Sequence, residues 1–180
     1  ILGPEMRSTG EVMGIGESFG EAFLKAQLAS NTRLPREGRV FISVRDDDKP
    51  AACELARRLS EMGFTIVATT GTQVALSRVG LESESVLKAI EGRPNILDRL
   101  RSGEIAMVVN TTEGAQAIRD SRSLRRQTLV SGIPYFTTMA AALAAVEAIE
   151  QLRSHPLSVC PIQDYHGRPG ARPSSYPKVG

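Results

Sequence analysis

A regular alternation of strand and helix patterns between residues 39 and 152 restricts the fold of this chain more than any other feature. Short, mostly apolar runs predict strands at 39–44, 64–68, 84–90, 105–110 and 133–137. Helical patterns lie between and after them, at 49–62, 72–79, 94–101, 115–129 and 137–152. Apolar strands that alternate with helices are typical of a parallel sheet covered on both faces. We therefore predict an α/β domain with a doubly wound, mostly parallel, five-stranded sheet.

The segments outside this alternation predict three parts in the chain. Residues 17–29 have helical spacing, and the polar stretch 30–38 reads as a linker. The tail from residue 154 is rich in proline and glycine, which predicts disorder apart from a possible edge strand at 157–162. We expect the divisions to fall at residues 1–33, 38–153 and 154–180.

Charge and cysteine usage favour a cytoplasmic protein without a nucleic-acid or membrane partner. The 22 Lys and Arg nearly balance the 20 Asp and Glu, so nothing in the charge demands nucleic acid. No apolar stretch approaches the roughly 20 residues that span a bilayer. Cys53 and Cys160 lie far apart without a CxxC spacing, which fits a reducing compartment. The first residue is not Met and no signal-peptide pattern follows it, so we expect a fragment of a longer protein.

Hydroxyl-bearing residues and a glycine follow three of the predicted strands. The residues are Ser43 and Lys49 in "SVRDDDK", Thr69, Thr70, Gly71 and Thr72 in "TTGT", and Asn110, Thr111 and Thr112 in "NTTEG". Loops at the carboxyl ends of parallel strands line the ligand crevice of such a sheet. Hydroxyls, a glycine-freed backbone, helix N-termini and one ammonium together suit a phosphate group. The sequence therefore predicts an anion site at this edge, with Lys49 turned inward and Asp46, Asp47 and Asp48 facing solvent.

Two other interpretations of these loops stay open at this point. Thr and Asn residues also cap the helices that follow them. A catalytic domain is the second alternative, but the only histidines, His155 and His166, lie in the tail. The predicted sheet therefore holds no Ser-His pair or metal cluster, and we predict a binding domain with no catalytic or metal-ligating residue.

Several longer stretches resemble a known family. "LGPEMRSTGEVMG", "SVRDDDK", "ATTGT", "EGRPNILDRLRSGEI", "NTTEG" and "IRDSRSLRRQTLVSGIPYFTT" occur in order, and together they resemble the C-terminal end of the carbamoyl-phosphate synthase large chain. The match runs from Leu2 to Leu152. Its first part is similar to the end of the second ATP-grasp unit, and the remainder is similar to the methylglyoxal-synthase-like, Rossmann-like regulatory domain.

The resemblance implies a role in a larger ligase. The parent enzyme makes carbamoyl phosphate for pyrimidine and arginine synthesis from bicarbonate, glutamine-derived ammonia and two ATP, with Mg or Mn, and pairs with a glutaminase small chain. The regulatory domain of relatives binds UMP or IMP, so this fragment would be non-catalytic and would hold no cofactor. By family position, the nucleotide would meet Lys49, Thr69, Thr70, Gly71 and Thr72, with Ser43, Lys88, Asn110, Thr111 and Thr112 nearby. Tyr135 and Thr137 match two residues that this domain contributes to an ornithine site.

Three rival functions share parts of this pattern. A stand-alone methylglyoxal synthase needs an aspartate after a Gly-Gly pair, whereas this chain has Gly92-Arg93-Pro94, and an arginine stays protonated. An IMP cyclohydrolase-type domain opens with a similar loop but lacks the "PEMRSTGE" segment. A structural domain with an empty pocket is the third, because Ala115 and Gln116 stand where relatives carry an Arg pair.

Overall fold

One parallel sheet forms the middle of the molecule, in the strand order β3-β2-β1-β4-β5. The computed structural model describes residues 12–111, 121–157, 159 and 161. The strands are β1 (Arg39–Ser43), β2 (Thr65–Ala68), β3 (Glu84–Ser85), β4 (Ile105–Asn110) and β5 (Tyr135–Phe136). All four neighbouring pairs are parallel, which confirms the predicted α/β class and makes the sheet parallel throughout.

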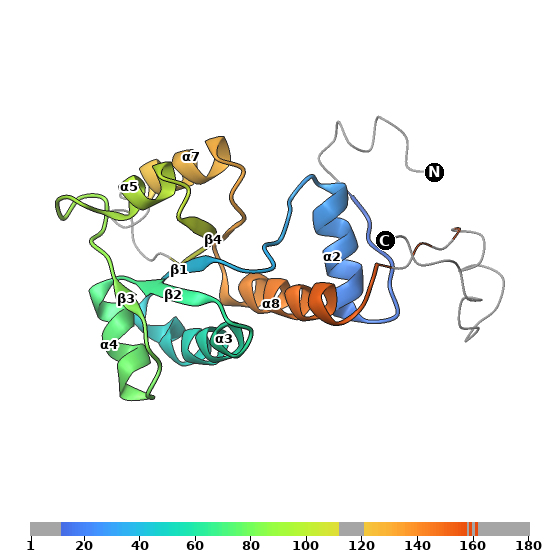
Figure 1. Ribbon diagram of the computed structural model, residues 1–180, viewed down its shortest axis with the longest axis horizontal. Helices are drawn as coiled ribbons and strands as arrows, with labels where there is room; N and C mark the ends of the chain where they lie inside the picture. Colours follow the sequence, from blue (N-terminus) through green and yellow to red (C-terminus); the bar gives the residue numbers. More distant parts are fainter. Residues whose placement is uncertain (1–11, 112–120, 158, 160, 162–180) are drawn as a thin grey trace.

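Helices cover both faces of the sheet, as Figure 1 shows. The helices are α2 (Phe19–Ala29), α3 (Lys49–Glu61), α4 (Thr70–Arg78), α5 (Ile96–Arg101), α7 (Arg122–Val130) and α8 (Met139–Ser154), with a 3-10 turn η1 (Asp46–Asp48) before α3. Helices α3, α4 and α8 share one buried apolar cluster with the sheet, and α5 and α7 share the other. The chain therefore has the three layers expected of a doubly wound domain.

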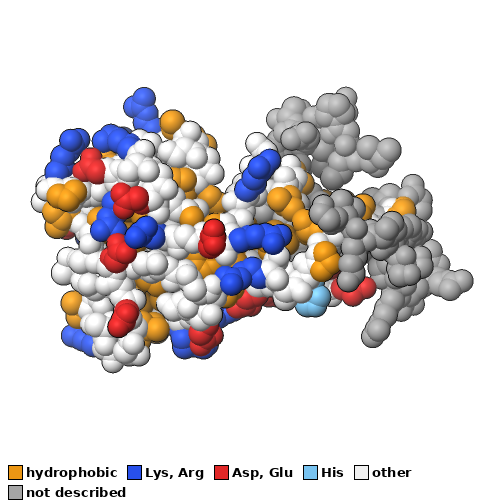
Figure 2. Space-filling model, viewed as in Figure 1, with side chains coloured by type: hydrophobic (Ala, Val, Ile, Leu, Met, Phe, Trp, Pro, Cys, Tyr) orange, Lys and Arg blue, Asp and Glu red, His pale blue; other side chains and the backbone are white. Residues whose placement is uncertain are grey.

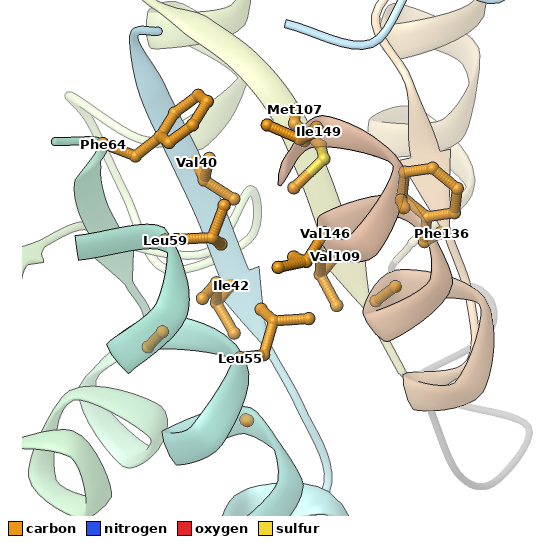
Figure 3. Close-up of a cluster of buried hydrophobic side chains, with 14 of the residues drawn as sticks. Val40, Ile42, Leu55, Leu59, Phe64, Met107, Val109, Phe136, Val146 and Ile149 are labelled. Atoms are coloured by element: carbon orange, nitrogen blue, oxygen red, sulfur yellow. The ribbon is translucent and has the colours of Figure 1, made fainter. Parts of the chain in front are cut away.

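Alternate residues of each central strand face opposite layers. Val40 and Ile42 of β1 join the cluster on the α3 and α8 side, whereas Phe41 joins the cluster on the α5 and α7 side. In Figure 3, Leu55 and Leu59 of α3 lie against Val40 and Ile42, while Val146 and Ile149 of α8 lie beside Val109 and Met107. Burial on both faces explains why these strands read as nearly continuous apolar runs.

The sheet edges are shorter than the sequence patterns predict. The expected strand at 84–90 pairs with β2 only over Glu84–Ser85, and Leu87 adds one isolated parallel bridge with Asn95. The strand goes no further because Lys88 N donates to Glu91 Oε2 at 2.8 Å and closes a turn there. The expected strand at 133–137 pairs only over Tyr135–Phe136. Pro134 has no N–H to donate, so the hydrogen-bond ladder between β4 and β5 cannot extend toward residue 133.

Helix ends follow recognisable local chemistry, and α4, α5 and α8 each begin two residues away from their predicted starts. Asn95 caps α5 in a reciprocal capping box with Asp98, and Thr138 caps α8 by accepting from Ala141 N. Helix α4 begins at Thr70, two residues before its predicted start, because Gln73 N donates to Thr69 O at 2.8 Å and closes the first turn. The predicted helix at 115–129 is described only from residue 121 on.

Helix α2 packs mainly on α8 (Figure 1). The amide of Gly20 donates to Glu147 Oε1 at 3.2 Å, and a Cβ at Gly20 would lie 3.0 Å from side-chain carbons of Glu147 and Gln151. The origin of residues 1–33 in an ATP-grasp unit stays a prediction, as does the division at residues 38 and 153. Of the possible edge strand at 157–162, the described positions 157, 159 and 161 are not in a strand.

Candidate functional site

A pocket of about 380 Å³ lies where the loops after β1 and β4 meet the turn after β3. Its volume falls within the range of about 300–1,000 Å³ that small-molecule sites occupy. One wall is apolar and the rest is polar and charged. The lining residues are Phe41, Ser43, Arg45, Asp46, Asp47, Lys88, Ala89, Ile90, Ile96, Asn110, Thr111, Ser121 and Leu124.

The structure brings four of the sequence-predicted site residues together in this pocket. Ser43 ends β1, Asn110 ends β4, and Thr111 follows it, so parallel pairing places them at one edge. Lys88 reaches the pocket from the turn after β3, with its side chain exposed to solvent. The predicted convergence of separate loops is therefore present for these residues, although their role in binding stays a prediction.

The other predicted effector residues lie beside the pocket without lining it. The residues are Lys49, Thr69, Thr70, Gly71 and Thr72, whereas Thr112 falls outside the described residues. Ser43 joins the two groups, because Thr69 Oγ1 donates to Ser43 Oγ at 3.2 Å. A Cβ added at Gly71 would lie 3.9 Å from Lys49 Nζ, so the ammonium stands next to the first turn of α4.

Threonine hydroxyls hold the loops in contact with one another. The Thr72 hydroxyl accepts from Val44 N at 3.2 Å, and the Thr111 hydroxyl accepts from Arg45 N at 3.2 Å. Both threonines are buried. Each hydroxyl therefore uses a lone pair to hold the loop after β1. The loops that carry Thr72 and Thr111 are in this way both bonded to the loop after β1.

Helix capping does not explain the threonine at the start of α4. Thr69 occupies the N-cap position but makes no side-chain capping hydrogen bond. Its hydroxyl turns instead toward Ser43 and toward Thr72 Oγ1, which lies 3.5 Å away. The capping interpretation is thus wrong for Thr69. Asp48 likewise stands at the N-cap position of α3 without a side-chain capping bond.

Two aspartates of η1, Asp46 and Asp48, make ion pairs at the pocket rim. Asp46 Oδ1 lies 2.7 Å from Lys49 Nζ, and this hydrogen bond and charge hold the pKa of Asp46 below its usual range. Asp48 Oδ2 lies 2.9 Å from Arg45 Nε. Burial acts to raise the pKa of Asp48, but hydrogen bonds from Thr111 and Arg45 outweigh it and lower that pKa. Negative charge is therefore part of the site alongside Lys49, Lys88 and Arg45.

The two residues predicted for ornithine differ in their surroundings. Tyr135 is half-buried, and its phenol oxygen accepts from Asn110 Nδ2 at 2.8 Å. Arg125 lies over its ring, 5.9 Å from the centroid. Thr137 is exposed two residues further on.

Sequence reasoning missed the apolar wall and part of the rim. Phe41 lies two residues before Ser43 on β1 and so shares its face, a signal that was present in the sequence. Arg45 and Ser121 carried no comparable signal, because each is one polar residue among several in its segment. Among the described residues no group of three His, Cys, Asp or Glu could hold a metal ion, and no described helix has the length and apolar character to cross a membrane.

Comparison with known proteins shows which proteins this chain is similar to. Residues 51–137 match the family described as MGS-like domain. The carbamoyl phosphate synthase large chain of Myxococcus xanthus is 53% identical over 97% of this chain. The chain contains an MGS-like domain and is homologous to that large chain. The predicted resemblance is thereby confirmed.

Other relatives extend this result and set its limits. The large chain of Brucella suis is 52% identical over 92% of this chain, and the C-terminal section of the Methanopyrus kandleri large chain is 50% identical over 92%. The chain spans only 16%, 14% and 31% of these three relatives. A crystal structure of methylglyoxal synthase from Elizabethkingia anophelis superposes with a TM-score of 0.51 at 16% identity, covering 77% of this chain and 97% of that one. This likeness confirms the fold of the MGS-like domain.

Proposed function

We propose that this chain is the regulatory end of a carbamoyl phosphate synthase large chain and binds a nucleoside monophosphate such as UMP or IMP. The observation that carries the proposal is the pocket at the carboxyl ends of β1 and β4, which gathers Ser43, Lys88, Asn110 and Thr111. Homology to large chains over nearly the whole sequence supports the regulatory role.

The two halves of the pocket suit the two halves of such a ligand. Phe41, Ile96 and Leu124 give an apolar wall on which a base or ribose could rest. The polar rim offers hydroxyls, the Asn110 amide and the Lys88 ammonium, which suit a phosphate. Acidic and basic side chains lie side by side over the face in Figure 2, an arrangement that gives no broad positive surface for a polyanion.

The proposal includes the parts of the parent enzyme that the chain does not contain. The parent ligase would use ATP with Mg or Mn, would pair with a glutaminase chain, and would act in the cytoplasm in pyrimidine and arginine synthesis. Tyr135 and Thr137 would contribute to an ornithine site completed by the rest of the large chain. Residues 38–153 would form the regulatory unit, and residues 1–33 would be the end of the preceding ATP-grasp unit.

Calorimetric titration of the chain with UMP and with IMP tests this function. We expect saturable binding of at least one of them. We expect Lys88→Met to weaken it about fivefold, because Lys88 is exposed and an exposed ion pair with the phosphate is worth up to about 1 kcal/mol. Arg126→Met is the matched control, since it removes the same charge from an exposed α7 residue that does not line the pocket. Turnover of dihydroxyacetone phosphate without nucleotide binding would favour the lyase instead.

A further inference from the structure

Asp46 stands between the pocket and the lysine predicted to bind phosphate. Asp46 lines the pocket, whereas Lys49 does not. The Asp46 carboxylate lies 2.7 Å from the Lys49 ammonium, within one turn of the chain where η1 runs into α3. The Lys49 ammonium is therefore paired with a carboxylate of the protein itself.

The ammonium that this carboxylate contacts also lies next to the N-terminal end of a helix. Lys49 Nζ lies 3.9 Å from the place of a Cβ on Gly71, in the first turn of α4. The N-terminal end of a helix carries the positive end of its dipole and attracts anions. Asp46 is thus paired with an ammonium that lies next to this helix end, where a phosphate would also be attracted.

The pair can open without disturbing the core. The Asp46 side chain is 90% exposed and that of Lys49 is 29% exposed. An ion pair this open to solvent contributes little to folding, so rotation of Asp46 into water breaks no buried contact. The Lys49 ammonium lowers the pKa of Asp46, so the carboxylate is ionised at neutral pH and available to pair with Lys49.

We propose that Asp46 is an internal counter-ion that competes with the ligand phosphate for Lys49 and thereby sets the affinity of the site. This inference rests on the proposed function, since it assigns a regulatory contact to the same pocket. Competition of this kind favours a dianionic phosphate over a monoanion, because the incoming group must replace a full negative charge at the ammonium. The contact would also prevent weak binding of small carboxylates.

The test compares two neutralising variants by calorimetry with UMP, IMP and inorganic phosphate as probes. Asp46→Asn removes the carboxylate from Lys49 and is expected to tighten binding about two- to fivefold, the range of an exposed ion pair. Asp47→Asn is the matched control, because Asp47 lines the same pocket but has no ion-pair partner among the described residues. We expect it to change affinity by less than about 1.5-fold. In a Lys49→Met background, Asp46→Asn should have no more effect than Asp47→Asn.

Each outcome decides between the two proposals. The counter-ion role of Asp46 is overturned if Asp46→Asn and Asp47→Asn tighten binding equally. It is also overturned if Asp46→Asn still tightens binding in the Lys49→Met background. Either result would leave the proposed function of the pocket intact. If the parent binds none of the three probes, the proposed function fails. In that case, phosphate binding by the Asp46→Asn variant alone would still support the counter-ion role of Asp46. If Asp46→Asn does not bind phosphate either, both the proposed function and the counter-ion role are overturned. Far-UV circular dichroism and thermal melts confirm that the variants are folded.

Discussion

The side-chain amide of Asn110 donates a hydrogen bond of 2.8 Å to the phenol oxygen of Tyr135. Asn110 ends β4 and lines the pocket, and Tyr135 begins the neighbouring strand β5. The bond therefore joins a residue predicted for the nucleotide site to one predicted for the ornithine site. A ligand that reorients either side chain would change the other.

Replacing Tyr135 by phenylalanine should weaken both the fold and the pocket. Asn110 is 5% exposed, so loss of the phenol leaves a buried amide donor without this partner, at a cost of about 1–2 kcal/mol in the free energy of unfolding. UMP affinity should fall severalfold, because the amide is no longer held in one orientation. Urea unfolding and calorimetry measure the two effects. Thr137→Val serves as the control. If Tyr135→Phe matches the parent in both assays, the hydrogen bond between Asn110 and Tyr135 does not support the fold or the pocket.

Thr72→Val should destabilise the chain more than Thr70→Val. The Thr72 hydroxyl is buried and accepts from Val44 N, whereas Thr70 is exposed at the start of α4. Valine keeps the shape but removes the hydroxyl, so Thr72→Val leaves the Val44 amide unpaired, at a cost of about 1–2 kcal/mol. Thr70→Val should stay within about 0.5 kcal/mol. Equal urea midpoints for the two variants would show that the hydroxyl does not hold the loop.

Glu84 should make stability depend on pH in the acid range. Its carboxylate accepts from Arg99 and Arg39. The hydrogen bond from Arg99, followed by that from Arg39, lowers the pKa of Glu84 against the opposing effect of burial. A group whose pKa is lowered by folding stabilises the fold above its unfolded value of about 4.3, and that contribution is lost as the pH falls through the folded pKa.

Denaturation at two pH values checks this expectation. The Glu84 side chain is 37% exposed, so solvent screening limits the effect to about 0.5 kcal/mol. At pH 7 the free energy of unfolding of the parent should exceed that of Glu84→Gln by this amount. The difference between the two should disappear near pH 3. Glu82→Gln, at an exposed neighbouring position, should show no such closure. A gap for Glu84→Gln that is constant with pH would argue that the carboxylate contributes through shape and not charge.

Gly14→Ala should loosen the contact between the N-terminal segment and α2. A Cβ at Gly14 would lie 2.0 Å from the backbone oxygen of Ala22, and a helix backbone cannot yield as a side chain can. The backbone must shift, which we expect to cost about 1–3 kcal/mol in urea unfolding. Gly80→Asn is the comparison, because Gly80 has a φ of +76° and open space around it. If Gly14→Ala and Gly80→Asn both lower the free energy of unfolding by a similar small amount, Gly14 is not closely packed against α2.

The central strands and the loop residues they position were predictable from sequence, and the arrangement of the site within those loops was not. The apolar run of β4 gave its bounds correctly at Ile105–Asn110, because burial on both faces leaves no polar break. Parallel pairing then placed Ser43 and Asn110 together. By contrast, three consecutive aspartates gave no sign that Asp46 would pair with Lys49, and hydroxyl residues gave no sign that Thr72 and Thr111 would bind the backbone of the first loop. Those outcomes depend on side-chain geometry that only the folded chain supplies.

Nuclear magnetic resonance titration of the ¹⁵N-labelled chain with UMP tests the central claim most directly. If the pocket between β1 and β4 binds the nucleotide, the amide signals of Ser43, Arg45, Lys88, Asn110 and Thr111 shift together and saturate, while those of α2 and the C-terminal half of α8 stay in place. Unchanged spectra with both UMP and IMP, or saturable shifts confined to α2 and α8, would contradict the assignment of this pocket as the effector site.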